Sequence, residues 1–575
     1  MTTPTPTAPD RIVRHADFPT LTQALDFAAM GETGLTLYGG RGECLRAMTY
    51  AELRTEALAL AGRLLAGGLN PGDRVGLAAE TDADFIRAFF ACQYAGLMPA
   101  PLPLPAPLGG RAASVEQIAR MLGAAEASAV FGPASYAEWL REAADQAGGI
   151  AIGPSLNELP EAVDVTLPDI GPDDLAYVQF SSGSTRFPTG VMVTHRSLMA
   201  NAVAITRDGL QVVAQDRAVS WLPLYHDMGL IGFLLAPLCC QMTVDLLPTS
   251  AFVRRPLLWL DLMSRHGGTV SYSPTFGYEL CARRAETGSS ATFDLSRWRI
   301  AGVGGDMVRV RPLTEFAERF GGSGFDAKAY VASYGMAEAT LAVAMAPLGR
   351  GLQVETLSLR DLEGDGDVTR AAIDARSRGF VRCGPALPAH RVEVRDADGR
   401  PIPDGHVGRI FIQGPSLMQG YFGNPDATAD VLSGDGWLET GDLGLIVEGE
   451  IVPTGRAKDL ILINGRNLWP QDLEWSVEAE LDKVRSGDVA AFHVTAGDAE
   501  RVVVLVQSRS GDAEARETLT SEVAALLRAR HGVETAVHLV GPHDLPKTTS
   551  GKLSRTRARA LFLAGTFDGL QAGRP

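Results

Sequence analysis

In the first part of the chain, two patterns of hydrophobic and polar residues alternate, one with the spacing of a helix and one typical of a buried strand. Residues 49–69 carry leucine and alanine at helical spacing, with Thr49 at the start and glycines at the end, which predicts an amphipathic helix. An apolar run at 74–80 follows and predicts a buried strand. The same pair of patterns returns at 84–97 and 127–132. Such alternation predicts an α/β fold with largely parallel sheets and helices on their faces.

The pattern changes twice towards the C-terminus. From about residue 386, short alternating runs at 390–403 and 407–414 predict an antiparallel β subdomain. After residue 459 the sequence predicts a small α+β domain of its own. Its helices are expected at 470–484 and 513–532, and its paired strands at 489–496 and 501–508.

Composition and charge limit the possible functions. At 575 residues the chain is too long for one ordinary core, so at least two domains are expected. A net charge of −16 argues against nucleic acid as the main partner, and any anionic ligand must meet a local basic patch. Six cysteines without a CxxC pair or metal-ligand spacing predict free thiols in a reducing compartment, and we expect the cytoplasm.

Neither the start of the chain nor its apolar stretches indicate membrane insertion. Residues 1–15 lack the basic and apolar regions of a signal peptide and are expected to be a disordered tail. The longest apolar run, 230–240, is far below the ~20 residues that span a bilayer, and it contains a proline. No integral membrane segment is therefore predicted. The proline-rich segment 100–110 is interpreted as a connector.

The stretch SSGSTRFPTG at 181–190 has the composition of a loop that holds a phosphate. It follows an apolar strand at 175–180 and precedes a strand and a helix, so its hydroxyls and N–H groups would converge on one anion. It has neither the spacing nor the lysine of a P-loop. The glycines at 302–305 do not fit the dinucleotide motif, and no G-x-S-x-G of hydrolases occurs. Taken alone, a flexible Ser/Gly turn explains the stretch equally well.

Four further stretches follow the loop in order. They are WLPLYHDMGLIG (221–232), SYGMAEATL (333–341), ETGDLG (439–444) with GRAKDLILINGRNLWPQDLE (455–474), and LPKTTSGKLSR (545–555). Together with the loop they resemble the adenylate-forming superfamily of acyl-CoA synthetases, luciferases and peptide-synthetase adenylation domains, over nearly the whole chain. The resemblance implies a large N-terminal AMP-binding domain at 16–457, made of two α/β subdomains and the antiparallel subdomain. A small mobile C-terminal domain would occupy 458–575.

The resemblance also implies roles for particular residues. Joining a carboxylate to the α-phosphate of ATP brings anions together, so the site must supply cations and aligned donors. Catalytic roles fall to Lys552, which would neutralise charge as the carboxylate attacks, to His226 beside that carboxylate, and to Glu338, which would bind Mg²⁺. The hinge between the domains is expected at Lys458. The residues expected to bind ATP and AMP are Ser182, Gly183, Ser184, Thr185, Gly305, Asp306, Tyr334, Gly335, Met336, Ala337, Asp442 and Arg456.

Simpler explanations remain open for four of these residues. Glu338 could be a charge at a helix N-terminus, and Tyr334 and His226 could be ordinary core side chains. Lys458 could be an exposed linker residue.

The second half of the loop indicates which subgroup of the superfamily the chain resembles. Acyl-CoA synthetases usually have glycine and lysine where this chain has Arg186 and Thr189, and this variant is similar to fatty acyl-AMP ligases. A polar segment at about 351–379 lies where those ligases carry an insertion that restrains the small domain and disfavours transfer to CoA. The alternative is that this polar segment is an ordinary surface loop. Arg409 departs from the glutamate common in the family and could alter the contact between domains.

The resemblance therefore implies an ATP- and Mg²⁺-dependent ligase. It would convert a medium- or long-chain fatty acid into an acyl-adenylate and pass the acyl group to the phosphopantetheine of an acyl carrier protein. Carrier proteins are typically acidic, so docking needs a local basic patch, for which we expect Arg555, Arg557 and Arg559, or Arg283 with Arg284. The nearest alternative is an acyl-CoA synthetase. From another class, the alternative is a catalytically silent lipid- or nucleotide-binding module.

Overall fold

The computed structural model describes most of the chain. The described ranges are 14–104, 110–163, 165–181, 189–286, 292–358, 377–463, 466–496, 499–547 and 553–567. The tail predicted at 1–15 lies almost wholly outside these ranges. Ser182, Gly183, Ser184 and Thr185 of the loop and Lys552 also lie outside them.

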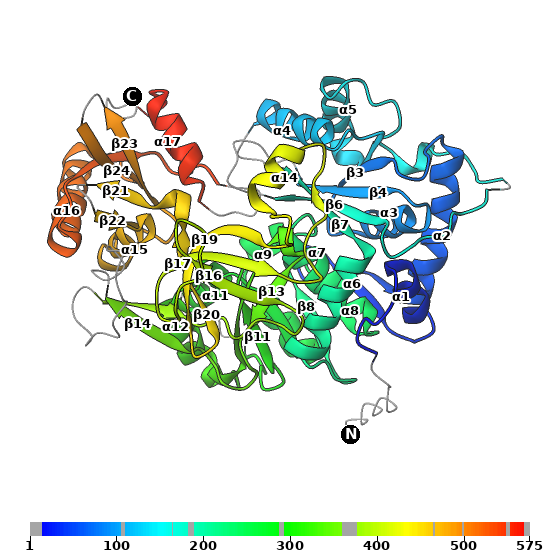
Figure 1. Cartoon of the computed structure of the whole chain (residues 1–575), viewed down its shortest axis with the longest axis horizontal. Coiled ribbons are helices and arrows are strands. Elements are labelled where there is room, and N and C mark those ends of the chain that lie inside the picture. Colours follow the sequence, from blue (N-terminus) through cyan, green and yellow to red (C-terminus); the bar gives the residue numbers. More distant parts are fainter. Residues whose placement is uncertain are drawn as a thin grey trace.

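An eight-stranded sheet forms the centre of the large N-terminal part (Figure 1). Its strands are parallel except at the two ends, where β12 pairs with β13 and β1 with β2 in antiparallel fashion. Strands β10 and β11 are buried along their whole length, as expected for parallel strands inside an α/β domain. In spatial order the strands are β13 (Ala342–Met345), β12 (Tyr330–Gly335), β11 (Ile300–Val303), β10 (Val270–Ser273), β8 (Arg217–Ser220), β9 (Thr243–Leu246), β1 (Gly34–Tyr38) and β2 (Cys44–Thr49).

Two three-stranded sheets form a second α/β region, in which β4 contacts β6. One sheet is parallel, with β4 (Met98–Leu102), β3 (Arg74–Ala78) and β5 (Ala129–Phe131). The other is antiparallel, with β18 (Gly420–Tyr421), β7 (Thr189–Thr194) and β6 (Leu175–Ser181). The helix predicted at 49–69 is α2 (Tyr50–Ala66), and Thr49 caps it by accepting a hydrogen bond from the backbone N–H of Glu52. The predicted α/β alternation is confirmed.

The connector predicted at 100–110 is partly wrong. Its first residues belong to β4, which pairs in parallel with β3, so that Pro99 lies opposite Val75 and Pro101 opposite Leu77. Proline cannot donate a hydrogen bond to a neighbouring strand, and it is therefore tolerated mainly at sheet edges. Strand β4 is at the edge of its sheet, which explains how a proline-rich sequence can form a strand here.

Antiparallel strands follow the large sheet along the chain. The predicted antiparallel subdomain is a four-stranded sheet of β16 (Arg391–Arg395), β17 (Gly408–Gln413), β19 (Leu438–Val447) and β20 (Glu450–Arg456). Strands β14 (Val354–Ser358) and β15 (Ser377–Val381) pair antiparallel at the two ends of the predicted insertion. Residues 359–376 of that insertion lie outside the described ranges.

Helices connect these strands and share one extensive core with them. The core of the large part runs from Ala16 to Ile451. Within the described ranges, no helix has the length and apolar character needed to cross a bilayer. The remaining α-helices of this part are α1 (Leu21–Ala28), α3 (Ala83–Tyr94), α4 (Arg111–Ala124), α5 (Ala137–Gln146), α6 (His195–Val203), α7 (Asp227–Leu230), α8 (Ala236–Cys239), α9 (Thr249–Arg254), α10 (Leu257–His266), α11 (Thr275–Glu286), α12 (Val310–Gly321) and α14 (Pro425–Val431).

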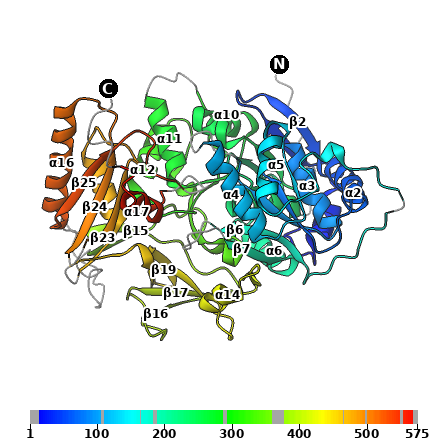
Figure 2. The same ribbon diagram turned by 90° about the horizontal axis from the view of Figure 1, so that it is seen from above.

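The C-terminal part has its own core, formed by buried residues between Ile461 and Phe567. Figures 1 and 2 show this part, coloured orange to red, at one end of the molecule and the first helices at the other. Its elements are β21 (Ile461–Ile463), β22 (Arg466–Leu468), α15 (Pro470–Glu480), β23 (Val489–Ala496), β24 (Ala499–Gln507), α16 (Ala513–His531), β25 (Thr535–Val540) and α17 (Arg555–Leu563). The predicted α+β organisation is confirmed, whereas the boundary at 457/458 stays a prediction.

Two arginines of the large part contact helix α15 of the small part. Arg378 on β15 forms an ion pair with Asp472, and its guanidinium lies 4.3 Å from the centre of the Trp475 ring. Arg309, just before α12, lies 3.7 Å from the Glu478 carboxylate. Because Arg378 falls within the predicted insertion, the insertion and the small part are in direct contact.

Candidate active site

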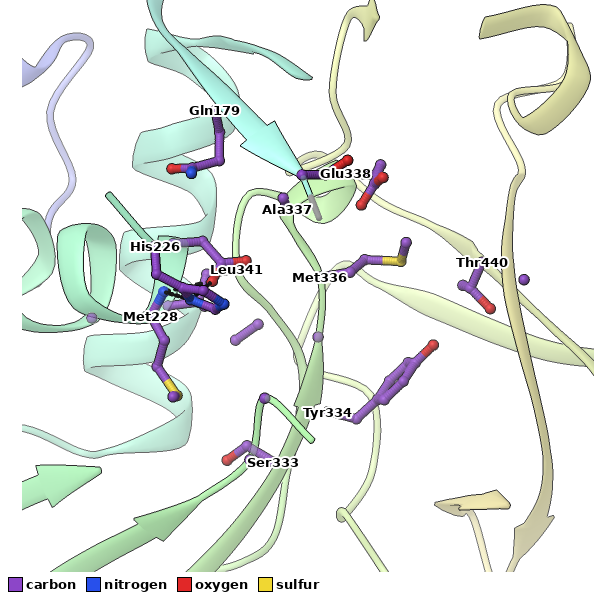
Figure 3. Close-up of a pocket in the computed structure, with 18 of the residues that line it drawn as sticks. Gln179, His226, Met228, Ser333, Tyr334, Met336, Ala337, Glu338, Leu341 and Thr440 are labelled. Atoms are coloured by element: carbon purple, nitrogen blue, oxygen red, sulfur yellow. Dashed lines mark hydrogen bonds and ion pairs between the residues drawn. The ribbon is translucent and has the colours of Figure 1, made fainter. Parts of the chain in front are cut away.

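One cavity of about 520 Å³ brings together segments that are far apart in the sequence (Figure 3). We call it the central cavity. Strand β6, the start of α7, the end of β12, strand β19 and the turn after β20 all contribute to its wall. The predicted site residues that line it are His226, Gly305, Tyr334, Gly335, Met336, Ala337, Glu338, Arg456 and Lys458.

Tyr334, Asp442 and Arg456 form a connected group at one side of the cavity. The Tyr334 hydroxyl donates to Asp442 Oδ2 at 2.8 Å, and Arg456 Nε lies 3.2 Å from Asp442 Oδ1. Asp442 and Arg456 face each other across the β19–β20 pairing. Burial and the Asp442 charge hold the pKa of Tyr334 well above its usual range, so the hydroxyl remains a neutral donor.

Glu338 lies in a short turn directly after β12. Its side chain is buried, and Oε1 accepts a hydrogen bond from the Tyr421 hydroxyl at 3.0 Å. Burial raises the pKa of this carboxyl, whereas the bond from Tyr421 and the positive charge of Arg456 oppose the rise. Thr340 closes the turn with a φ of 67°, which is rare for a β-branched residue, and its hydroxyl donates to Ser416 O at 2.7 Å. The backbone around Glu338 is therefore held in a strained conformation.

His226 caps the N-terminus of α7. Its Nδ1 lies 2.5 Å from Asp227 Oδ1, and that carboxylate oxygen also accepts a hydrogen bond from the Met228 N–H at 2.7 Å. The Met228 N–H also donates to Nδ1, at 3.3 Å. Nδ1 is thus engaged by the first turn of its own helix, which leaves Nε2 as the ring nitrogen that can meet a ligand in the cavity.

Lys458 follows Arg456 in the short turn after β20 and lines the central cavity. Loss of solvent and the positive charge of Arg456 lower the pKa of its amine. Asp306 lies outside the cavity lining, and its carboxylate accepts a hydrogen bond from the Met307 N–H at 2.8 Å. Ser181 and Thr189, which flank the undescribed part of the loop, both line the cavity, and their hydroxyl oxygens are 3.4 Å apart.

Apolar side chains line a further part of the central cavity, and no motif in the sequence marks them. Two π-helical segments, η3 (Ala204–Gly209) and η4 (Ile231–Leu235), contribute to this wall. Such segments are rare and often occur at functional sites. The apolar lining includes Ile205, Leu210, Gly232, Phe233, Val270, Leu341 and Met345.

Two polar residues of the wall, Tyr421 and Gln179, were also missed. Nothing in the local sequence marks Tyr421, which reaches Glu338 across 83 positions of the chain. Gln179 did carry a signal, because it is a single amide within the otherwise apolar strand β6. Arg409 pairs with Glu439 on the neighbouring strand at 2.7 Å, so its contact lies inside the antiparallel sheet.

Comparison with known proteins agrees with this arrangement. Residues 40–422 match the AMP-binding enzyme family. The chain belongs to this family. Among AMP-binding enzymes, a Caulobacter vibrioides protein provisionally named an acyl-CoA synthetase is 62% identical over 98% of each chain. A long-chain-fatty-acid–AMP ligase of Mycolicibacterium smegmatis is 33% identical, over 92% of this chain and 90% of its own. A medium-chain-fatty-acid–acyl-carrier-protein ligase of Moorena producens is 32% identical over 97% of each chain.

Solved structures of AMP-binding enzymes resemble this chain along almost its whole length. A chain from a study of fatty acyl-adenylate ligases of E. coli and L. pneumophila is 43% identical, with a TM-score of 0.91 over 96% of this chain and 100% of its own. A fatty acyl-adenylate ligase of L. pneumophila, solved with acyl adenylate and pyrophosphate, is 29% identical. Its TM-score is 0.74, and the match covers 96% of this chain and 98% of its own. The predicted resemblance to fatty acyl-AMP ligases, the fold class and the ligase activity are confirmed.

Proposed function

We propose that this enzyme activates a medium- or long-chain fatty acid and passes it to an acyl carrier protein. A carboxylate oxygen of the acid attacks the α-phosphorus of ATP, and the bond from that phosphorus to pyrophosphate breaks. The thiol of phosphopantetheine then attacks the acyl carbon and displaces AMP. The observation that carries the proposal is the central cavity, which joins a polar group at Tyr334, Asp442 and Arg456 to an apolar wall.

At the polar end, Tyr334 would pack against adenine, with Gly305, Asp306 and residues 335–337 beside it. Asp442 would accept hydrogen bonds from the ribose hydroxyls, and Arg456 would approach the same sugar. The contacts between Tyr334, Asp442 and Arg456 support this assignment, because they hold the carboxylate and the cation in place before the nucleotide binds.

Glu338 would hold Mg²⁺. Among the described residues, no group of three or more His, Cys, Asp or Glu side chains is placed to bind a metal. A single carboxylate nevertheless fits this ion, since Mg²⁺ is commonly held by one or two carboxylates together with substrate phosphates. When bound, the ion would offset the charge of the phosphates. Residues 182–185 would hold these phosphates, and Lys552 would neutralise the charge that develops during attack.

His226 would orient the substrate carboxylate. With Nδ1 fixed against Asp227, its Nε2 can donate to a carboxylate oxygen when the ring is protonated.

The domain organisation of the proposal is a tail at 1–15, a large domain at 16–457 and a small domain at 458–575, with Lys458 at the hinge. The separate cores on either side of residues 453–460 support this boundary. We place the enzyme in the cytoplasm, because all six cysteines are free thiols.

The apolar wall would receive the acyl chain, and Gly232 would set its depth. A Cβ added to Gly232 would meet only Leu341 Cδ2, at 3.6 Å, so a larger side chain would extend into open cavity. We expect Gly232→Leu to lower kcat/KM for long-chain acids at least about tenfold more than for medium-chain acids, the scale of one or more excluded methylenes. Pyrophosphate exchange with acids of increasing length measures this.

The matched control for Gly232→Leu is Gly123→Leu, which adds the same side chain to an exposed helical glycine of α4. This variant should keep the chain-length profile of the wild type. An unchanged profile in Gly232→Leu would show that the acyl chain lies elsewhere.

Of the three arginines expected at 555–559 to bind the carrier protein, only two are available. Arg555 is not available, because it forms ion pairs with Asp459 at 3.0 Å and Glu474 at 2.7 Å inside the small domain. Arg557 and Arg559 are exposed on α17. Arg283 and Arg284 in the last turn of α11 remain a second candidate.

Charge reversal tests this patch. We expect Arg557→Glu with Arg559→Glu to slow acyl transfer to the carrier protein at low salt, because both changes repel an acidic partner. Adenylate formation should be unaffected. A control with the same change in net charge is Arg41→Glu with Arg400→Glu, on exposed arginines of the large part. Transfer at the wild-type rate at low salt would exclude α17 as the docking surface.

The second candidate function is that of an acyl-CoA synthetase, which the name of the 62% identical Caulobacter vibrioides relative favours. The two candidates differ in whether CoA consumes the adenylate. Both candidates share the adenylation step, which pyrophosphate exchange driven by a panel of fatty acids measures. We expect exchange with medium- and long-chain acids, and its complete absence with every acid of the panel would show that the carboxylate substrate is of another class.

A further inference from the structure

A buried amide in the wall of the central cavity has no part in the proposed function so far. Gln179 on β6 is 2% exposed and lines the cavity. It lies three positions before Ser182, on the strand that leads into the phosphate loop. Figure 3 shows Gln179 on the same side of the cavity as His226. Gln179 thus lies on the strand that leads into the loop proposed to hold the phosphates, and on the same side of the cavity as the histidine proposed to meet the carboxylate.

Gln179 is hydrogen-bonded to the backbone next to His226. Its Nε2 donates to the carbonyl oxygen of Tyr225 at 2.8 Å. This carbonyl belongs to the peptide bond that connects Tyr225 to His226. The N–H of the same peptide donates to Pro223 O at 3.2 Å. Both polar groups of the peptide are therefore fixed, and this fixes the direction in which the His226 side chain leaves the backbone.

The hydrogen bond spans 46 positions of the chain and joins two segments that are far apart in the sequence. One segment is β6, which continues into the loop proposed to hold the phosphates. The other is the turn that ends at His226, proposed to meet the carboxylate. Attack on the α-phosphorus requires the carboxylate and the phosphate at a defined separation, and small errors in such a geometry are costly. A direct bond between the two segments can maintain that separation.

A second buried glutamine, which lies outside the cavity, provides a comparison for Gln179. Gln93 on α3 is 1% exposed, and its Nε2 donates to the carbonyl oxygen of Ala176 at 2.7 Å, also on β6. In both glutamines, Oε1 accepts no hydrogen bond from any described group. Gln93 lies outside the cavity lining, whereas Gln179 belongs to it. The two glutamines share their burial and an Nε2 bond to a distant backbone carbonyl. They differ in that Gln179 Nε2 also lies 3.4 Å from Phe180 O, and in that Gln179 lines the cavity.

We propose that Gln179 is a positioning residue, which ties the phosphate-loop strand to the backbone of His226 and so holds His226 against the substrate carboxylate during adenylation. This inference rests on the proposed function. It predicts that losing the Nε2 donor affects the use of the fatty acid more than it affects folding. The ATP contacts at Tyr334, Asp442 and Arg456 should be unchanged.

The test uses Gln179→Glu in the full-length enzyme. An ionised carboxylate cannot donate to Tyr225 O, but a protonated carboxyl can. We expect kcat/KM for the fatty acid in pyrophosphate exchange to fall at least about tenfold at alkaline pH, the scale of a lost hydrogen bond to a positioned group. Part of this loss should be recovered as the pH falls and the new carboxyl protonates. KM for ATP should stay close to the wild-type value.

Two further variants keep the test decisive. Gln179→Met removes the donor without adding charge, and it should show the loss at every pH with no recovery. Gln93→Glu introduces the same carboxyl at the matched position, and it should lower the melting temperature while preserving KM for the fatty acid and the wild-type pH profile.

Parallel losses in the Gln179→Glu and Gln93→Glu enzymes, each following its loss of thermal stability, would overturn the positioning role. So would a wild-type fatty-acid KM in Gln179→Met. These outcomes leave the proposed function intact, because the wild type remains active. Absence of exchange by the wild type with every fatty acid would instead defeat the proposed function and this inference together.

Discussion

Replacing Lys552 with alanine should slow adenylate formation by about 100-fold or more, the scale of losing one positioned electrostatic group. The carboxylate attacks a triphosphate that is itself anionic, and the chain as a whole carries a net charge of −16. A cation aimed at the developing charge is therefore needed locally. The motif LPKTTSGKLSR assigns this role to Lys552 by resemblance to adenylate-forming enzymes. Pyrophosphate exchange with a fatty acid and ATP measures the effect.

The two half-reactions separate a charge-screening role from a structural one. Transfer from chemically supplied acyl-adenylate should be far less affected, since no phosphate bond forms in that step. The neighbouring Lys547 is exposed, and Lys547→Ala should leave both half-reactions near the wild-type rate. Equal losses in adenylation and transfer for Lys552→Ala would contradict the assignment.

Removing residues 359–376 and joining β14 to β15 by a short turn should produce measurable acyl-CoA synthesis. By resemblance to adenylate-forming enzymes, we expect the small domain to turn about the hinge after adenylation to admit a thiol. A segment held against it adds a cost to the second state, and about 1.4 kcal/mol is enough to shift a two-state population tenfold. Adenylation should stay near its starting rate. The thioester is measured with fatty acid, ATP and CoA.

The contact of Arg378 with Asp472 and Trp475 provides a narrower version of this test. Arg378→Ala removes the contact between β15 and α15 without shortening the insertion. If this contact restrains the small domain, the single substitution should reproduce part of the CoA activity of the shortened enzyme. If neither variant uses CoA, restraint by the insertion is not the cause, and a missing CoA-binding surface is.

Much of the fold follows from local sequence signals. The helix at α2 begins at the predicted threonine cap, and α16 ends at Gly532, which has the left-handed conformation that glycine adopts easily. The strands β23 and β24 pair as predicted from their alternation. These elements depend on neighbouring residues, so a single sequence contains the information. Strand β4 was missed because its prolines obscure the strand pattern, which an edge position nevertheless permits.

The central cavity could be predicted only in part. Motifs identified Tyr334, Glu338, Asp442 and Arg456, and the structure brings them together. The apolar wall could not be found, because its residues come from elements that are far apart in the sequence. In addition, η3 and η4, which supply part of it, are π-helical, and their period differs from the 3.6 residues used to read helices. The bond from Gln179 to Tyr225 O was equally hidden, since a backbone acceptor leaves no trace in the sequence.

The defining property of the proposed enzyme is that it makes acyl-adenylate and delivers the acyl group to a carrier protein rather than to CoA. Mass spectrometry of the products tests this most directly, with a fatty-acid panel, ATP, and either CoA or acyl carrier proteins bearing phosphopantetheine. We predict acyl-adenylate in both mixtures, acyl-carrier thioester in the second, and no appreciable acyl-CoA in the first. Efficient conversion of the adenylate to acyl-CoA by the wild-type enzyme would contradict this and identify an acyl-CoA synthetase.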